Sequence, residues 1–161
     1  MKKKMPKSSA LSKISVGINT GCKSVRFDRK KIILMVRKIA KQFGVKKAAI
    51  DITVADDKEI IKVNRQFFKT GKITDVISFD LSDRKGDKVY DIIVNGELAQ
   101  RQAKLRGHST QAELALYIVH GMLHNLGFDD LSEAKAKKMH KAEDALLEKF
   151  GYGIVYNKKL R

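Results

Sequence analysis

Two histidines four residues apart carry the clearest chemical signal in this chain. His120 and His124 have a spacing that puts both imidazoles on one face of an α-helix, a turn apart, where they can bind a single ion. Gly127 suits the end of that helix, and Asp130, three residues later, can turn back to the same ion. Two nitrogens, one oxygen and an open fourth position are typical of a catalytic zinc ion. The sequence therefore predicts one bound divalent transition metal ion, with Zn²⁺ as the first candidate.

Two neighbouring side chains compete for the third ligand position. Asp129 is adjacent to Asp130, but the spacing from Gly127 favours Asp130 as the ligand and leaves Asp129 to cap the following turn. His140, on the helix predicted next along the chain, is a rival ligand whose distance from the motif the spacing does not control. The predicted ligands are therefore His120, His124 and Asp130.

The residue that would act as acid or base is less clear. Zinc proteases place a glutamate directly after the first histidine, where this chain has Gly121, so the sequence disfavours a protease. Glu113 precedes His120 by seven residues, which is two helical turns and the same face. Glu113 is therefore the candidate to orient a ligand histidine or to act as a base through water, with a solvated helix carboxylate as the alternative interpretation.

The composition points to a polyanionic partner. The chain has 161 residues and a formal net charge of +16, which suits one domain that is drawn to RNA or DNA. No basic amphipathic helix with bulky aromatic residues is evident, so a membrane partner is disfavoured. Cys22 is the single cysteine, so no internal disulfide is possible and a buried or incidental thiol is expected. We expect a cytoplasmic location because no apolar segment follows the basic start of the chain.

Hydrophobic periodicity predicts an α+β domain. A disordered basic arm is expected over residues 1–13, a single metal-hydrolase domain over 14–155, and a basic tail over 156–161. Alternation predicts four strands, and helical spacing with capping residues predicts five helices. The strands are expected at 14–18, 49–54, 75–79 and 88–94, and the helices at about 28–43, 56–67, 96–106, 110–126 and 132–150.

Three sequence blocks together resemble a known family. His-Gly-Met-Leu-His-Asn-Leu-Gly-Phe-Asp-Asp, beginning at His120, resembles the H-G-x-L-H-x-x-G-[YF]-D-[HD] signature of the YbeY family. Val-Asn-Arg-Gln-Phe from Val63 and Thr-Asp-Val-Ile-Ser-Phe from Thr74 resemble its L-N-x-x-[YF]-R and P-T-D-V-[LI]-S-F segments. Tyr-Asp-Ile-Ile-Val from Tyr90 resembles its G-D-I-x-I strand. The blocks cover about residues 14–152, nearly the whole chain.

The resemblance implies a fold, an activity and a set of partners. The expected fold is a small mixed four-stranded sheet packed with about five helices, reminiscent of the zincins, with the metal site at the end of a helix in the C-terminal half. The expected activity is metal-assisted endonucleolytic cleavage of single-strand-type RNA in small-subunit ribosomal RNA maturation and ribosome quality control. The expected partners are ribosomal RNA and the small ribosomal subunit, with a ribosomal protein or an assembly GTPase as further candidates.

Two positions depart from the family pattern. The third ligand of the family is usually histidine, and the matching residue here is Asp130, which adds a negative charge and favours harder metals. Phe68 occupies the position of the family's arginine, so Lys69 becomes the candidate contact for an RNA phosphate. Lys72 and Arg65 are the other residues that could supply this positive charge through a rearranged loop. Asp75 and Ser78 are expected either to shape the cleft wall or to cap strand ends. The Phe68 replacement supports an alternative function, a weakly catalytic ribosome-assembly factor with a structural metal.

Overall fold

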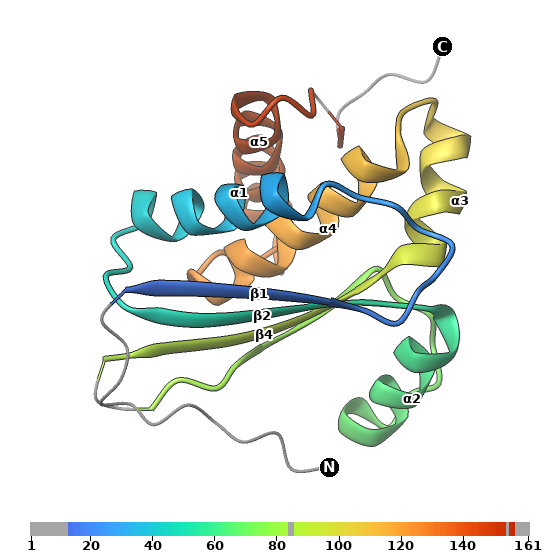
Figure 1. The fold of residues 1–161 in the computed structure, drawn as a ribbon, viewed down its shortest axis with the longest axis horizontal. Helices are drawn as coiled ribbons and strands as arrows, with labels where there is room; N and C mark the ends of the chain where they lie inside the picture. The colour runs from blue at the N-terminus through green and yellow to red at the C-terminus, as the bar shows by residue number, and fades with distance from the viewer. Residues whose placement is uncertain (1–12, 84–85, 154, 157–161) are drawn as a thin grey trace.

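The computed structural model describes residues 13–83, 86–153 and 155–156, and these residues form the predicted α+β fold (Figure 1). Most of the predicted arm and all but Tyr156 of the predicted tail lie outside the described residues. Four strands and five helices follow one another in the order β1 (Ile14–Thr20), α1 (Arg29–Gln42), β2 (Ala48–Ala55), α2 (Asp57–Phe68), β3 (Val76–Asp80), β4 (Lys88–Asn95), α3 (Gly96–Arg106), α4 (Thr110–Asn125) and α5 (Glu133–Lys149).

The four strands form one mixed sheet in the order β1-β2-β4-β3. Strands β1, β2 and β4 are parallel, and β3 pairs antiparallel with β4 at the edge. Ile52 and Ile92 are partners in register at the centre and are fully buried on the face that packs against the helices. The neighbouring residues on the same strands point to the opposite face because side chains alternate along a strand.

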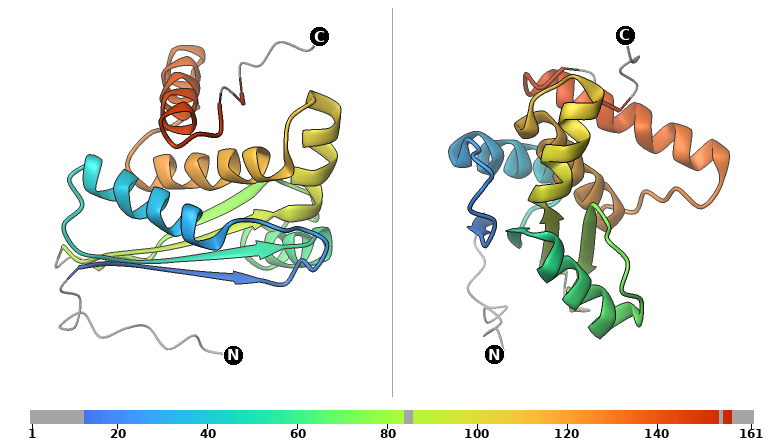
Figure 2. Two further views of the ribbon diagram at one scale, coloured as in Figure 1. Left: turned by 45° about the horizontal axis from the view of Figure 1, so that its top comes forward. Right: turned by 90° about the vertical axis from the view of Figure 1, so that its right-hand side faces the viewer.

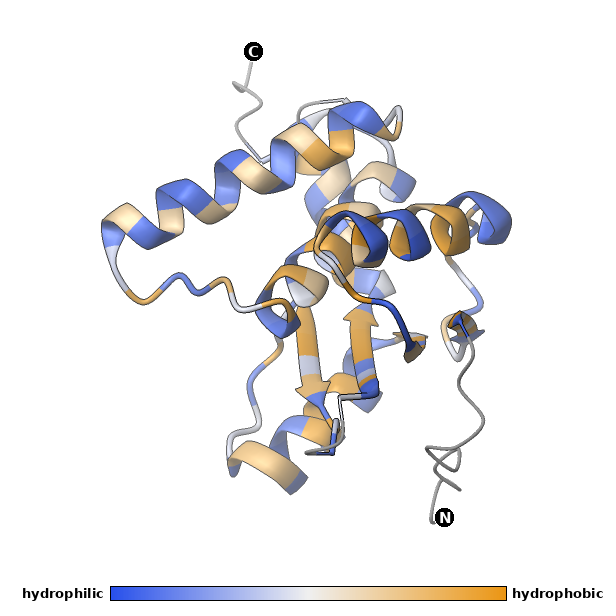
Figure 3. Ribbon diagram, turned by 90° about the vertical axis from the view of Figure 1, so that its left-hand side faces the viewer, coloured by the Kyte–Doolittle hydropathy of each residue, from blue (hydrophilic) through white to orange (hydrophobic). Residues whose placement is uncertain are grey.

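Helix α4 lies at the centre of the molecule, between the sheet and α5 (Figure 2). It is buried on almost every side, as expected for a helix with apolar residues around its whole circumference. The outer helices differ from the strands in hydropathy (Figure 3). Helices α1 and α5 alternate between hydrophilic and hydrophobic residues, whereas the strands are largely hydrophobic. A Cβ atom at Gly121 would come within 3.0 Å of Cγ2 of Ile92 and of Val76, so the glycine allows α4 to approach the sheet closely.

Side-chain caps fix where each helix begins. Asp28 accepts a hydrogen bond from the Lys31 amide at the start of α1, and Asp56 accepts one from the Glu59 amide at the start of α2. Ser109 caps α4, and Ser132 caps α5. These caps explain why the predicted helix boundaries agree with the structure to within one or two residues.

Helix α2 lies on the opposite side of the sheet from α1 and α5 (Figure 2). It buries Ile60 and Val63 against Ala55 of β2 and Ile77 of β3. This second, smaller apolar cluster places the end of α2 beside the edge strand β3. None of the helices in the described ranges is long and apolar enough to cross a membrane.

Candidate metal centre

The predicted metal ligands lie together at the end of α4. His120 and His124 direct their Nε2 atoms toward each other at 2.9 Å. Oδ2 of Asp130 lies 3.7 Å from Nε2 of His120 and 3.9 Å from Nε2 of His124. A tetrahedral ion with bonds of about 2.1 Å separates its ligand atoms by roughly 3.4 Å, so this triangle has the size that one such ion requires. It is the one metal-type group of histidine, cysteine or acidic residues found in the described part of the chain.

The turn after α4 brings Asp130 back to the histidines. The amides of Leu126 and Phe128 donate to carbonyls of the last helical turn, at Met122 and Leu123. Gly127 lies between them with φ of 100°, a left-handed conformation that favours glycine. The chain therefore reverses immediately after the helix, as the spacing of the motif predicts.

The outer ring nitrogens of both histidines are engaged by protein acceptors. Nδ1 of His124 lies 3.2 Å from the Phe128 carbonyl, which can only accept, so this nitrogen carries the proton. Nδ1 of His120 donates to the buried carboxylate of Glu143. In the neutral tautomers that these contacts select, both Nε2 atoms present lone pairs to the same point. Two lone pairs that converge on one point suit a bound metal ion, and the residues therefore fit one.

The electrostatic surroundings also favour a cation at His120. Burial lowers the pKa of its imidazole, but the hydrogen bond and charge of Glu143 act in the opposite direction and prevail. Asp75 and Asp130 add to this effect, so the pKa of His120 lies above its ordinary value. The acidic residues that raise the pKa are the same ones that would stabilise a metal ion at this position.

The sequence of this chain matches a known protein family. The family model described as "Endoribonuclease YbeY" matches residues 18–151. The chain belongs to the YbeY family. The endoribonuclease YbeY of Staphylococcus aureus strain bovine RF122 / ET3-1 is 37% identical over 114 residues, which cover 65% of this chain and 74% of that protein. The corresponding protein of strain JH9 is 36% identical with the same coverage.

The fold of this YbeY family member is also found in a solved structure. The solution structure of TM1509 from Thermotoga maritima matches with a TM-score of 0.56 and 20% sequence identity. The match covers 90% of this chain and 99% of that one. This likeness supports the predicted α+β architecture and extends to the fold alone.

Glu143 is the site residue that the sequence did not reveal. It is fully buried on α5 and accepts hydrogen bonds from Nδ1 of His120 and, at 2.9 Å, from Nδ1 of His140. His140 therefore faces Glu143, outside the ligand triangle, and its ring stacks on Tyr156 with centroids 3.5 Å apart. The sequence does hold a signal for Glu143. It follows His140 by three residues and lies on the apolar side of an amphipathic helix, where a carboxylate needs a partner.

Glu113 lines the same pocket as His120 and Asp130, but its carboxylate is engaged by other residues. The pocket has a volume of about 540 Å³ and is lined by Glu113, Tyr117, Asp75 and other residues around His120. The Glu113 carboxylate is buried and contacts Nε2 of His108, with Arg106 at 3.7 Å. Thus Glu113 does not take the orienting role at His120, which Glu143 fills.

Other predicted residues surround the pocket. Asp129 accepts from the Leu131 amide, and with Lys135 this contact lowers its pKa, in agreement with a capping role. The Asp75 carboxylate lines the pocket wall and accepts from the Val76 amide at the start of β3, so it has both predicted roles. Lys69 ends α2 in a left-handed conformation, and it is absent from the described residues that line the metal pocket.

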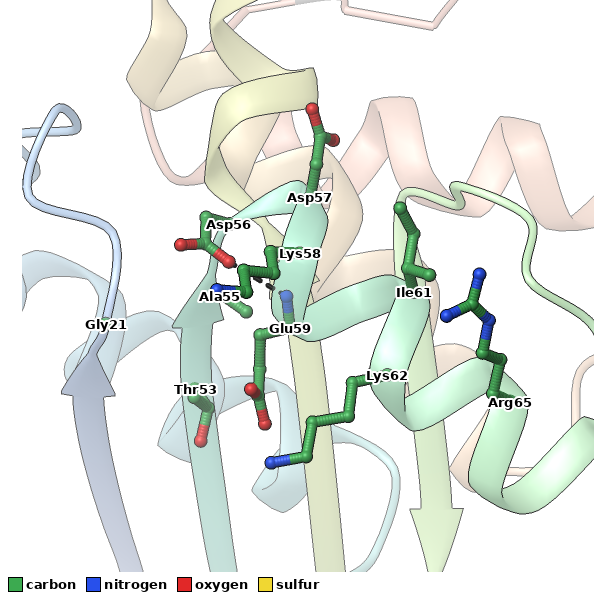
Figure 4. Close-up of a pocket in the computed structure, with 10 residues that line it drawn as sticks. All are labelled: Gly21, Thr53, Ala55, Asp56, Asp57, Lys58, Glu59, Ile61, Lys62 and Arg65. Carbon is green, nitrogen blue, oxygen red and sulfur yellow. Dashed lines mark hydrogen bonds between the residues drawn. The ribbon is translucent and has the colours of Figure 1, made fainter.

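A larger groove contains none of the candidate metal ligands in its lining. It has a volume of about 1050 Å³ and runs along α2 beside the ends of β1 and β2 (Figure 4). Its lining mixes opposite charges, with Asp56 and Glu59 beside Lys58, Lys62 and Arg65. The smaller pocket is the better candidate for the active site because histidine and carboxylate ligand atoms converge there.

Proposed function

We propose that this protein is a metal-dependent endoribonuclease that cleaves single-strand-type RNA. The observation that carries the proposal is the convergence of His120, His124 and Asp130 in a chain that belongs to the YbeY family. Small-subunit ribosomal RNA maturation and ribosome quality control in the cytoplasm are the proposed setting. The net charge of +16 supports a polyanionic substrate that is bound largely through its backbone.

The ligand residues favour Zn²⁺ as the resident ion. When bound, such an ion supplies Lewis-acid polarisation of a phosphoryl oxygen and lowers the pKa of water. His120, His124 and Asp130 would hold it and leave a fourth position open. The Asp130 carboxylate contributes a negative charge where a histidine would be neutral, which makes the ion less electrophilic and widens the choice toward harder divalent metals.

The remaining residues bind and orient the substrate and move protons. We assign proton transfer to Glu113, which lines the same pocket and has His108 as its partner. We assign a phosphate contact to Lys69, which is exposed at the end of α2. We expect Glu113→Gln to lower kcat with little change in metal content, and Lys69→Gln mainly to raise KM for RNA.

One observation favours a second candidate function. Phe68 takes the place of the arginine in the family pattern, and it carries no charge for a phosphate. A ribosome-assembly factor that binds RNA around a structural metal would tolerate this change. Binding to a ribosomal protein or an assembly GTPase would fit the same candidate.

Cleavage of a structured RNA by the zinc-loaded protein tests the proposal. We expect cleavage by the wild-type chain and loss of it in His120→Ala, with folding confirmed by circular dichroism. Unchanged cleavage in His120→Ala would exclude the metal-hydrolase mechanism. Cleavage that is present only in Phe68→Arg would support the assembly factor in place of the nuclease.

A further inference from the structure

Three phenylalanines form an exposed aromatic surface beside the edge strand. Phe67 and Phe68 at the end of α2 are 56% and 53% exposed. Both rings contact Phe79 of β3, with centroid separations of 5.1 Å for Phe67 and 6.1 Å for Phe68. The Phe68 and Phe79 rings are nearly parallel, at 11°. Large aromatic side chains normally bury most of their area, so this Phe67–Phe68–Phe79 platform has surface available for a ligand.

Cationic side chains border the platform. Lys69 and Lys72 lie in the exposed loop that follows Phe68. The Asn64 side chain donates to the Lys72 carbonyl at 2.6 Å and holds this loop in place. Arg65 packs against the loop, since a Cβ atom at Gly71 would lie 3.1 Å from its Nε. The aromatic rings therefore lie next to positive charges on an ordered loop, which suits an anionic ligand that has flat rings.

The platform is continuous with the metal pocket around the free edge of β3. A shallow pocket of about 420 Å³ is lined by Phe68 and Lys72 together with residues of β3. Its lining includes Ile77, which faces α2, and also Val76 and Ser78, which lie next to Gly121 of α4. Two further lining residues, Ile73 and Thr74, are shared with the pocket that contains His120.

We propose that the Phe67–Phe68–Phe79 platform binds an unpaired base of the RNA substrate by stacking. The neighbouring phosphates would lie against Lys69 and Lys72, and the strand would continue around β3 to the metal pocket. This inference rests on the proposed function, because it names how that substrate is held. Stacking on an aromatic side chain is available to every base, and it requires a base that is not already paired in a duplex.

The positive charges around the platform favour RNA over a protein as the bound partner. An apolar protein surface would bury the rings but would leave the lysines and Arg65 without complementary charge. A single-stranded nucleic acid satisfies both features at once, and it must reach the adjoining metal pocket in any case. The observations therefore favour RNA, and association with a second protein becomes an outcome of the test.

A tryptophan at position 68 reports directly on stacking. The chain contains no tryptophan, so Phe68→Trp introduces a single tryptophan whose fluorescence can be excited apart from that of the tyrosines. His120→Ala is added to prevent cleavage, and the probe is a short unstructured RNA titrated into the full-length protein. We expect quenching of the new tryptophan by RNA, and none by heparin, a polyanion without bases. The matched control is Leu105→Trp in the same background, at a position on α3 that is 72% exposed, where RNA should have little effect.

Affinity measurements complete the test. Phe68→Leu should weaken binding of the single-stranded RNA by about 5- to 150-fold, whereas Phe68→Tyr should retain it and heparin binding should not change. Equal RNA affinity in Phe68→Leu, or no response of the tryptophan when RNA binds, would overturn the platform. A change of oligomeric state in Phe68→Leu with unchanged RNA affinity would show a protein-docking surface in its place. If RNA binds without a tryptophan response while cleavage depends on His120, the platform fails and the nuclease function stands.

Discussion

The carboxylate of Glu143 on α5 accepts a hydrogen bond from Nδ1 of His120 on α4. Glu143 is fully buried, and its other oxygen accepts from Nδ1 of His140. A buried carboxylate shared by two imidazoles fixes the tautomer and the ring orientation of His120, a proposed metal ligand. Helix α5 therefore contributes to the candidate metal centre without supplying one of the proposed ligands, and we assign Glu143 as a positioning residue.

Replacement of Glu143 by glutamine should weaken metal binding. Glutamine offers one acceptor oxygen in place of two and removes the negative charge, so it cannot serve both histidines in the same way. We expect a 10- to 100-fold loss of Zn²⁺ affinity, the usual cost of losing such a partner, approximated from other metal sites. Competition with a chromophoric chelator would measure it.

A second glutamate on the same helix provides the control. Glu148 is exposed, so Glu148→Gln should leave the affinity within about twofold of the wild-type value. Equal affinities for Glu143→Gln and the wild-type chain would mean that the contact with His120 does not organise the metal site. Circular dichroism of both variants separates this effect from loss of fold.

Adjacent aspartates should respond very differently to substitution. Asp130 lies within 4 Å of both histidine Nε2 atoms, whereas Asp129 caps the next turn and pairs with Lys135. Asp130→Ala removes the proposed third ligand and should lower Zn²⁺ affinity by at least about 100-fold, more than the loss of an outer partner. Asp129→Ala should change it little. Metal content after dialysis would decide, and the reverse pattern would reassign the third ligand.

Local signals in the sequence account for much of the fold and for the grouping of the three candidate ligands. Alternation, capping residues and left-handed glycines each act within a few residues, so strand and helix positions could be predicted closely. The His120, His124 and Asp130 motif is also local, because one helical turn and one chain reversal bring the three together.

Long-range contacts could not be predicted in this way. Glu143 reaches His120 across 23 residues, and the contact exists only because α5 crosses α4. The placement of β3 at the edge, next to β4, brings Asp75 to the pocket wall and Phe79 to the end of α2. Hydrophobic periodicity determines which residues face a core, but it does not specify strand order or helix crossing. These features required the three-dimensional structure.

Acid should remove the stabilisation contributed by Asp57. Its carboxylate pairs with Arg101 of α3 at 2.8 Å and accepts from Asn95, and the hydrogen bond from Arg101 is the main reason that its pKa is lowered, despite the opposing effect of burial. Glu97 also contacts the Asp57 amide. Because the folded-state pKa lies below the unfolded one, this contribution is complete above the unfolded pKa and disappears as the pH falls through the folded value.

Asp57→Asn should therefore destabilise the protein at neutral pH and not in strong acid. We expect a loss of about 0.5–1 kcal/mol in the free energy of unfolding at pH 7, since Arg101 is partly exposed, and convergence with the wild-type value in acid, once the pH has fallen through the lowered pKa of Asp57. Urea denaturation across this range would measure it. Glu59→Gln, in the same helical turn, is the control, and a constant difference between Asp57→Asn and the wild-type chain at every pH would contradict the assignment.

Gly121 should be the least replaceable residue of the motif that is not itself a ligand. A Cβ atom there would meet Ile92 and Val76 at 3.0 Å, so Gly121→Ala pushes α4 away from the sheet and should cost about 1–3 kcal/mol of stability. The displacement also moves His120, so Zn²⁺ affinity should fall with it. Gly21→Ala is the matched control, because the nearest atom to its added Cβ is 4.0 Å away, and it should stay within about 0.5 kcal/mol of the wild-type chain. Equal stability of the two variants in urea would show that α4 does not need this close approach to the sheet.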